Sequence, residues 1–162
     1  MKRWVPGLLC LAATLQAAAA VPFRLALEDG SGWIAPGDLA GRPAVFLFWD
    51  TECAPCLQEL KHSAELRRAF PQAVLVAVSL SGRDATRRTL AKVKLDADVR
   101  RAASPDSPRG LLASLGDPGG SLPFTAIFAG DGAQCLHRLG PLTAEVLTLA
   151  ASRCSSQSPQ PP

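Results

Sequence analysis

The chain has 162 residues, of which 48% are hydrophobic and 19% are charged, and its formal net charge is +3. This length and hydrophobic content fit one globular domain that can bury its own core without cross-links. The weak positive charge excludes the strong electrostatic footprint of a nucleic-acid-binding protein. We therefore expect one folded domain and no nucleic-acid partner.

The N-terminus has the pattern of a secretory signal peptide. Lys2 and Arg3 precede an apolar stretch that ends near Leu15, and the alanines at 18–20 fit a cleavage site. The alternative is an uncleaved membrane anchor formed by residues 4–20, although its strongly apolar part is short for the ~20 residues of a membrane span. We predict export to the periplasm or another extracytoplasmic compartment.

The first half of the remaining chain predicts a β-α-β unit. Residues 21–43 carry several turn signals and predict a small hairpin. The apolar runs at 44–48 and 73–80 predict buried strands, and the segment 55–70 predicts a helix that Pro71 ends. Because both strands are apolar throughout, we expect them to be parallel and joined by a right-handed crossover.

The second half predicts further helices and a second pair of strands. Helices are expected at 83–94 and 108–115. A strand at 124–128, a Gly-Asp-Gly turn, a strand at 133–138 and a helix to about Arg153 follow. The order is therefore β-β-α after β-α-β.

The segment "FWDTECAPCLQEL" places Cys53 and Cys56 three residues apart, just after a predicted strand. A zinc site needs about four ligands, and the chain has no second CxxC. A haem attachment needs His after the second cysteine, where this chain has Leu57. A disulfide across so short a loop constrains the unfolded chain little. We predict a redox-active pair, with no metal and no cofactor.

The position of the pair predicts a different role for each sulfur. Pro55 suits the first turn of a helix, so Cys53 would lie at the helix N-terminus, where N–H groups and the helix dipole stabilise a thiolate. Cys56 would lie one turn inside. We predict that Cys53 attacks as the nucleophile and that Cys56 resolves the mixed disulfide.

The chain resembles the thioredoxin superfamily and, within it, the secreted TlpA/ResA-like thiol-disulfide oxidoreductases. The resemblance is carried by three segments: residues 25–56, "LPFTAIF" and "DGAQCLHRLGPL". The resemblance implies an α/β, thioredoxin-like fold with a central mixed β-sheet flanked by helices. The implied domains are a signal peptide at 1–20, a thioredoxin-like domain at 21–154, and a tail at 155–162 that lacks core-forming residues and is expected to be disordered.

The resemblance also implies the surroundings of the disulfide. Pro123 is expected to be cis and to lie against the disulfide, and the backbone of Leu122 is expected to bind a substrate chain as an added strand. Trp49 matches the first tryptophan of the family's pattern, with a packing role as the alternative. The implied substrate contacts are Trp49, Ala54, Pro55 and Leu122.

Three positions, each compared with its counterpart in similar proteins, bear on the protonation of the cysteines. Glu59 lies three residues after Cys56, so on a helix it shares that cysteine's face. A buried Glu59 would have a raised pKa and could carry the proton of Cys56, as the matching glutamate of similar proteins implies; a solvated helix acid is the alternative. Leu47 stands where ordinary thioredoxins have an acid. Glu52, where many relatives have Trp, disfavours the Cys53 thiolate and opposes the helix dipole.

The other cysteines leave alternatives open. Cys10 would leave with the signal peptide. Cys135 and Cys154 lie in elements expected to pack together, so a structural disulfide, two buried free thiols and an auxiliary redox relay are all compatible with the sequence. Strand alternation would place Cys135 and His137 on one face, but two ligands are too few for a metal.

The predicted function is extracytoplasmic thiol-disulfide exchange with protein cysteines. The resemblance implies the reducing direction. Cytochrome c maturation is one example of such a role. A membrane thiol reductase would then supply the electrons. The alternatives are a disulfide-donating oxidase, and a copper-delivery or other binding module without catalysis on the same fold.

Overall fold

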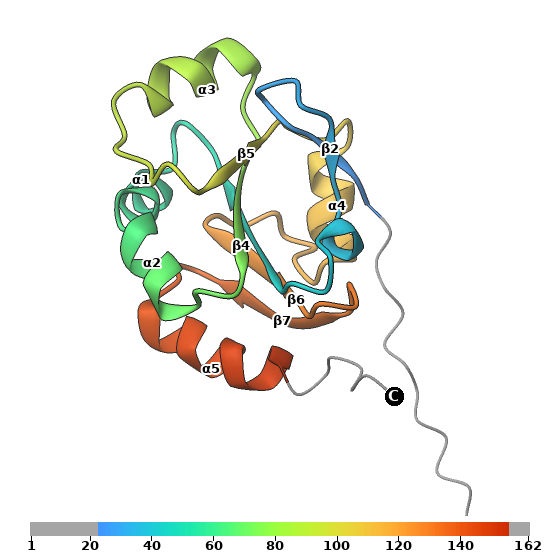
Figure 1. Cartoon of the computed structure of the whole chain (residues 1–162). Helices are drawn as coiled ribbons and strands as arrows, with labels where there is room; N and C mark the ends of the chain where they lie inside the picture. Colours follow the sequence, from blue (N-terminus) through green and yellow to red (C-terminus); the bar gives the residue numbers. More distant parts are fainter. Residues whose placement is uncertain (1–22, 156–162) are drawn as a thin grey trace, which may run out of the picture.

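The computed structural model describes residues 23–155 (Figure 1), so the predicted signal peptide or anchor, Cys10 and residues 156–162 lie outside the described residues. No helix within the described range is long and apolar enough to cross a membrane. In chain order the elements are β1 (Leu25–Ala26), β2 (Trp33–Ile34), a 3-10 turn (Pro36–Asp38), β3 (Ala44–Trp49), α1 (Ala54–Lys61), α2 (Ser63–Ala69), β4 (Val74–Ser79), α3 (Arg83–Leu90), β5 (Arg100–Ala102), α4 (Pro108–Ser114), β6 (Phe124–Phe128), β7 (Gln134–Leu139) and α5 (Ala144–Ser155).

The main sheet has the order β5-β4-β3-β6-β7. β3 is parallel to β4 and antiparallel to β6, as the β-α-β and β-β-α patterns predict. Every residue of β3, β4 and β6 is buried, because helices α1, α2 and α5 cover one face of the sheet and α4 with the β1-β2 hairpin covers the other. This is the mixed sheet flanked by helices that the sequence predicts.

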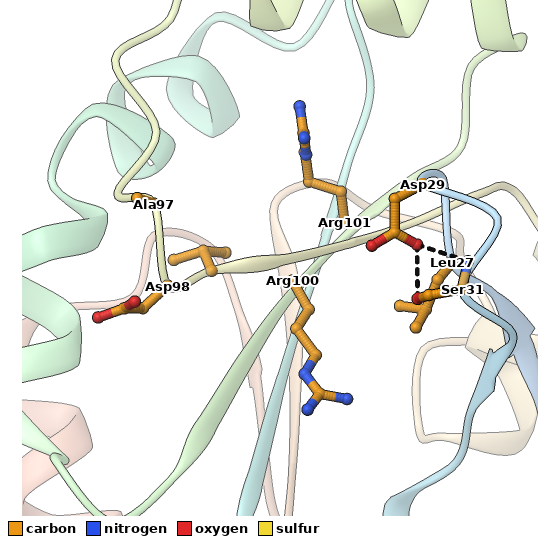
Figure 2. Close-up of a pocket in the computed structure, with 8 residues that line it drawn as sticks. Leu27, Asp29, Ser31, Ala97, Asp98, Arg100 and Arg101 are labelled. Atoms are coloured by element: carbon orange, nitrogen blue, oxygen red, sulfur yellow. Dashed lines mark hydrogen bonds between the residues drawn. The ribbon is translucent and has the colours of Figure 1, made fainter.

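β5 is an edge strand that the sequence analysis missed, because its Arg-Arg-Ala sequence is short and mostly exposed. Residues after β1 cover this edge: Leu27 bridges Ala102, and the N–H of Glu28 donates to the carbonyl of Arg101 at 2.9 Å. Figure 2 shows this edge, with the side chains of Arg100 and Arg101 pointing in opposite directions. The N-terminal hairpin thus shields one edge of the sheet from pairing with another chain.

Two predicted helices differ from the structure. The segment 55–70 is not one helix, because α1 and α2 meet at His62, whose ψ is 11°, and the buried hydroxyl of Ser63 accepts a hydrogen bond from the N–H of Asp96. The segment 83–94 is helical only to Leu90, and the chain then turns so that Val93 packs into the core. Apolar spacing alone predicts neither break.

A β-bulge corrects the expectation that Cys135 and His137 share a face. The register of β6 and β7 shifts between Ile127 and Phe128, which leaves Cys135 as an extra residue. Cys135 turns toward α5, while His137 pairs with Ala126, whose side chain belongs to the opposite core. An inserted residue reverses the alternation of faces along a strand.

The structure contains a disulfide between Cys135 and Cys154, with their Cα atoms 5.6 Å apart. It joins β7 to the end of α5. Cys135 lies beside the end of β6 that pairs with Ala44, the residue at which β3 begins, whereas the CxxC follows the other end of β3. Since β3 rises about 3.3 Å per residue, this position favours a structural role over a direct redox relay.

Removal of this bridge tests its structural role. The double variant C135A/C154A should lose about 3 kcal/mol of unfolding free energy, because the bridge closes a long loop in the unfolded chain. The measurement is urea unfolding under oxidising conditions. The matched control, C53A/C56A, removes a bridge with a sequence separation of 3 instead of 19 and should lose less. Equal stability of C135A/C154A and the parent chain would contradict this account.

Candidate active site

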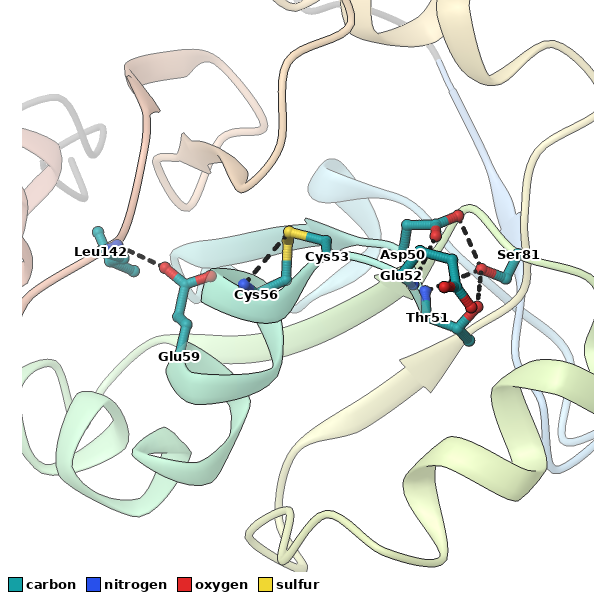
Figure 3. Close-up of a disulfide and its surroundings, with 8 residues drawn as sticks. All are labelled: Asp50, Thr51, Glu52, Cys53, Cys56, Glu59, Ser81 and Leu142. Atoms are coloured by element: carbon teal, nitrogen blue, oxygen red, sulfur yellow. Dashed lines mark hydrogen bonds between the residues drawn. A yellow bond between two sulfur atoms is a disulfide. The ribbon is translucent and has the colours of Figure 1, made fainter.

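The CxxC pair lies at the junction of β3 and α1 and forms a disulfide (Figure 3). The Cα atoms of Cys53 and Cys56 are 5.2 Å apart. Cys53 is the N-cap of α1, and its sulfur accepts a hydrogen bond from the N–H of Cys56 at 3.3 Å. Cys53 is half-buried, while Cys56 is fully buried. The structure therefore presents one sulfur of the pair at a helix N-terminus.

This geometry supports two distinct chemical roles. In the reduced protein, the N–H groups and dipole of α1 would favour a thiolate at Cys53. The side chain of Cys56 is 0% exposed, so an external disulfide cannot reach its sulfur directly. The arrangement can therefore carry out attack by the outer sulfur and intramolecular resolution by the inner one.

The Leu122–Pro123 peptide bond is cis in the structure. Because Phe124 pairs with Phe48, Pro123 lies at the end of the sheet from which β3 continues toward the CxxC. The carbonyl of Pro123 accepts a hydrogen bond from the N–H of Gly140 at 2.9 Å, and Leu122 is half-buried. The fold thus brings the predicted proline loop to the same sheet end as the cysteines.

The remaining predicted substrate contacts divide into exposed and buried residues. Ala54 and Pro55 are exposed at the start of α1. Trp49 is only 1% exposed and packs in the core that contains Cys56. This burial fits the packing role that the sequence left open for Trp49, and its contact with substrate stays a prediction. Its Nε1 has no hydrogen-bond partner among the described residues.

Glu59 is buried one turn beyond Cys56 on α1 (Figure 3), with 5% of its surface exposed. One carboxyl oxygen accepts a hydrogen bond from the backbone N–H of Leu142, and the other has no partner in the described part of the chain. Burial raises the pKa of Glu59 to about 7, and the hydrogen bond from Leu142 opposes this rise. A carboxyl with this pKa can accept and release a proton near neutral pH.

A groove runs past Glu59 between α1 and the segment that follows β7. Its lining includes Pro55, which lies between the two cysteines in the sequence. Glu59 itself lines this groove, so its carboxyl lies close to a solvent-filled space. The residues that line the groove include Pro55, Gln58, Glu59, His62, Pro141 and Leu142.

A polar cluster that the sequence did not predict lies just before Cys53. The hydroxyl of Ser81 donates to the carboxylate of Asp50 at 2.8 Å and accepts from the N–H of Thr51 at 3.0 Å (Figure 3). The available signal was that two predicted parallel strands both lead into polar residues. The carboxyl ends of parallel strands meet at one edge of a sheet, where sites tend to form.

Comparison with known proteins shows likeness in structure. No family model matches the chain, and no curated protein matches it. A thioredoxin-related protein from Neisseria meningitidis serogroup B superposes with a TM-score of 0.69 at 20% identity, covering 82% of this chain and 99% of that one. StoA from Bacillus subtilis gives a TM-score of 0.61 at 22% identity, covering 82% and 98%.

A further similar structure is a secreted Mycobacterium tuberculosis disulfide oxidoreductase described as homologous to Escherichia coli DsbE. Its TM-score is 0.59 at 19% identity, covering 80% of this chain and 94% of that one. Together with the strand order described above, these likenesses confirm the predicted thioredoxin-like fold.

The buried carboxyl predicts a pH-dependent stability. Glu59 has its ordinary pKa of 4.5 in the unfolded chain and about 7 in the folded protein. Its contribution to stability is therefore fully present below pH 4.5 and is lost as the pH rises through 7, by about 3 kcal/mol in total. The variant E59Q should lack this loss, as urea unfolding of the oxidised protein from pH 4 to 8 would show.

The control for this experiment is E65Q, which changes an exposed glutamate on α2. E65Q should retain the pH dependence of the parent chain. Parallel stability curves for E59Q and the parent chain would show that Glu59 does not titrate as described.

Proposed function

We propose that this chain, which has a thioredoxin-like fold, is an extracytoplasmic thiol-disulfide oxidoreductase that exchanges its Cys53–Cys56 disulfide with protein cysteines. The observation that carries the proposal is one half-buried and one fully buried cysteine, joined as a disulfide at the N-terminus of α1. The similar M. tuberculosis protein, described as a secreted disulfide oxidoreductase, supports both the activity and the location.

In the reducing direction, the Cys53 thiolate attacks a substrate disulfide and forms a mixed disulfide, which releases the first substrate thiolate. Glu59 accepts the proton of Cys56, whose thiolate then attacks the sulfur of Cys53. The second substrate thiolate leaves, and the Cys53–Cys56 disulfide remains. Two electrons pass from the protein to the substrate, and each departing thiolate takes up a proton.

The substrate is a protein segment that binds across the disulfide. The exposed residues Ala54 and Pro55 flank the accessible sulfur, and the backbone of Leu122 offers a strand for pairing with an extended chain. This mode of binding recognises the shape of an extended cysteine-containing segment.

The proposed physiological direction is reduction, with cytochrome c maturation as one example. The exposed Glu52 next to Cys53 disfavours the thiolate and so favours a reducing couple. An oxidising compartment does not regenerate thiols, so a membrane thiol reductase is the proposed electron donor. Export would depend on residues 1–20.

Trapping of the mixed disulfide tests the proposed exchange. In C56S, Cys53 can attack a disulfide but the resolving thiol is missing, so a peptide containing a disulfide should accumulate as a covalent adduct. Mass spectrometry under denaturing, non-reducing conditions measures the adduct. We expect at least a tenfold excess of adduct over the parent chain, on the scale of the rate advantage of a positioned thiol.

The matched control is C53S, which keeps only the buried Cys56. This variant should form little adduct, because the sulfur of Cys56 is inaccessible in the folded protein. Equal trapping by C53S and C56S would contradict the assigned roles. Absence of an adduct with C56S would contradict the exchange itself.

A further inference from the structure

The carboxylate of Asp50 holds together the turn that carries Cys53. One oxygen accepts a hydrogen bond from the N–H of Glu52 at 2.9 Å, and the other accepts from the hydroxyl of Ser81 at 2.8 Å. The carbonyl of Asp50 accepts from the N–H of Cys53 at 3.1 Å. Both the side chain and the backbone of Asp50 therefore close the turn that leads from β3 to the disulfide (Figure 3).

Ser81 connects this turn to the rest of the fold. It lies after β4, and its hydroxyl also accepts a hydrogen bond from the N–H of Thr51 at 3.0 Å. Its own backbone is held in turn: its N–H donates to the hydroxyl of Ser79 at 3.2 Å, and its carbonyl accepts from the hydroxyl of Thr86 at 3.3 Å. Ser79 and Thr86 are both 1% exposed. The turn is thus tied to a buried part of β4 and α3.

We infer that Asp50 and Ser81 are positioning residues for the exchange reaction, and that the Asp50 carboxylate also makes the Cys53–Cys56 couple more reducing. This inference rests on the proposed function. The hydrogen bonds of Asp50 and Ser81, here called the tether, limit the movement of Cys53 during thiol-disulfide exchange. Holding a reacting group in a fixed orientation raises the rate of exchange. The negative charge lies in the same closed turn as Cys53 and disfavours the thiolate that forms on reduction.

Other charged groups near this turn stay unchanged in the test. Glu52 is exposed in the turn itself, and Glu59 is buried on α1 beyond Cys56. On the segment that holds Ser81, Arg83 and Asp84 are both exposed. Substitution at Asp50 therefore changes one charge against a constant background.

Two variants separate the charge from the tether. D50N removes the charge but keeps an oxygen acceptor and an amide that can pair with Ser81. S81A keeps the charge but removes the hydroxyl that binds both Asp50 and Thr51. S81T restores a hydroxyl and serves as the conservative rescue. D84N removes the charge of an exposed aspartate on α3 that pairs with Arg87 at 3.0 Å, and so is the matched charge control.

The experiment measures the equilibrium and the rate of exchange with glutathione. Reduction consumes two glutathione molecules and yields two protein thiols and one oxidised glutathione, so the equilibrium constant reports the stability of the reduced pair. In D50N it should move toward the thiols by roughly three- to tenfold, as expected for removal of one nearby charge at a partly exposed site. D84N should leave the constant unchanged within about twofold.

S81A should slow the exchange by roughly tenfold while its equilibrium constant stays within about twofold of the parent value, and S81T should restore the rate. An equilibrium constant for D50N equal to that of D84N would overturn the assigned charge effect. A parent-like rate for S81A would overturn the positioning role. If the parent chain itself shows no exchange, the proposed function fails; if it exchanges but all variants behave alike, only this inference fails.

Discussion

The complete burial of β3 is the constraint on which the arrangement of the site depends. Both faces of this strand are covered, and both of its neighbours are buried strands, so its register against β4 and β6 is firmly specified. The chain leaves β3 at Trp49 and reaches Cys53 within one turn. The packing of the sheet therefore sets where the disulfide lies relative to Pro123 and to the start of α1.

The same packing imposes an electrostatic cost. Glu59 is a buried residue of α1, and a single hydrogen bond from Leu142 does not replace the hydration that its carboxyl loses. The carboxyl therefore holds its proton to a higher pH than an exposed glutamate does. The segment that supplies Leu142 lies between Cys135 and Cys154, so the second disulfide brackets the element that covers this carboxyl. The Cys135–Cys154 disulfide and the buried carboxyl of Glu59 are thus linked through the segment that contains Leu142.

The sequence predicts those features that follow from strong local patterns. Apolar runs predicted β3 and β4, and the Gly-Asp-Gly turn marked the pair of strands β6 and β7. The position of Pro55 predicted the start of α1 close to its observed bound. The bulge at Cys135 was not predictable, because alternation assumes an unbroken register. β5 was missed because its stability comes from pairing with β4 and residues near Leu27 and not from apolar side chains.

Within the site, the sequence predicts contacts between residues that are close together in the chain better than contacts between residues that are far apart. The spacing of Cys53, Cys56 and Glu59 on one helix is local and was predicted. The contact of Glu59 with Leu142 and that of Asp50 with Ser81 join residues far apart in the chain, so only the folded structure could show them. The burial of Trp49 against the helices likewise became visible only in the folded structure, because its position in the motif is compatible with both packing and substrate contact.

The reduction potential of the Cys53–Cys56 couple in the purified protein tests the central claim most directly. The protein would be equilibrated with glutathione or dithiothreitol buffers, and its thiols would be counted by mass after alkylation. The account predicts a reversible two-electron couple at or below about −220 mV, as suits a reductant supplied with electrons by a partner. A potential near about −120 mV would contradict the reducing direction, and the absence of a reversible couple would contradict thiol-disulfide exchange altogether.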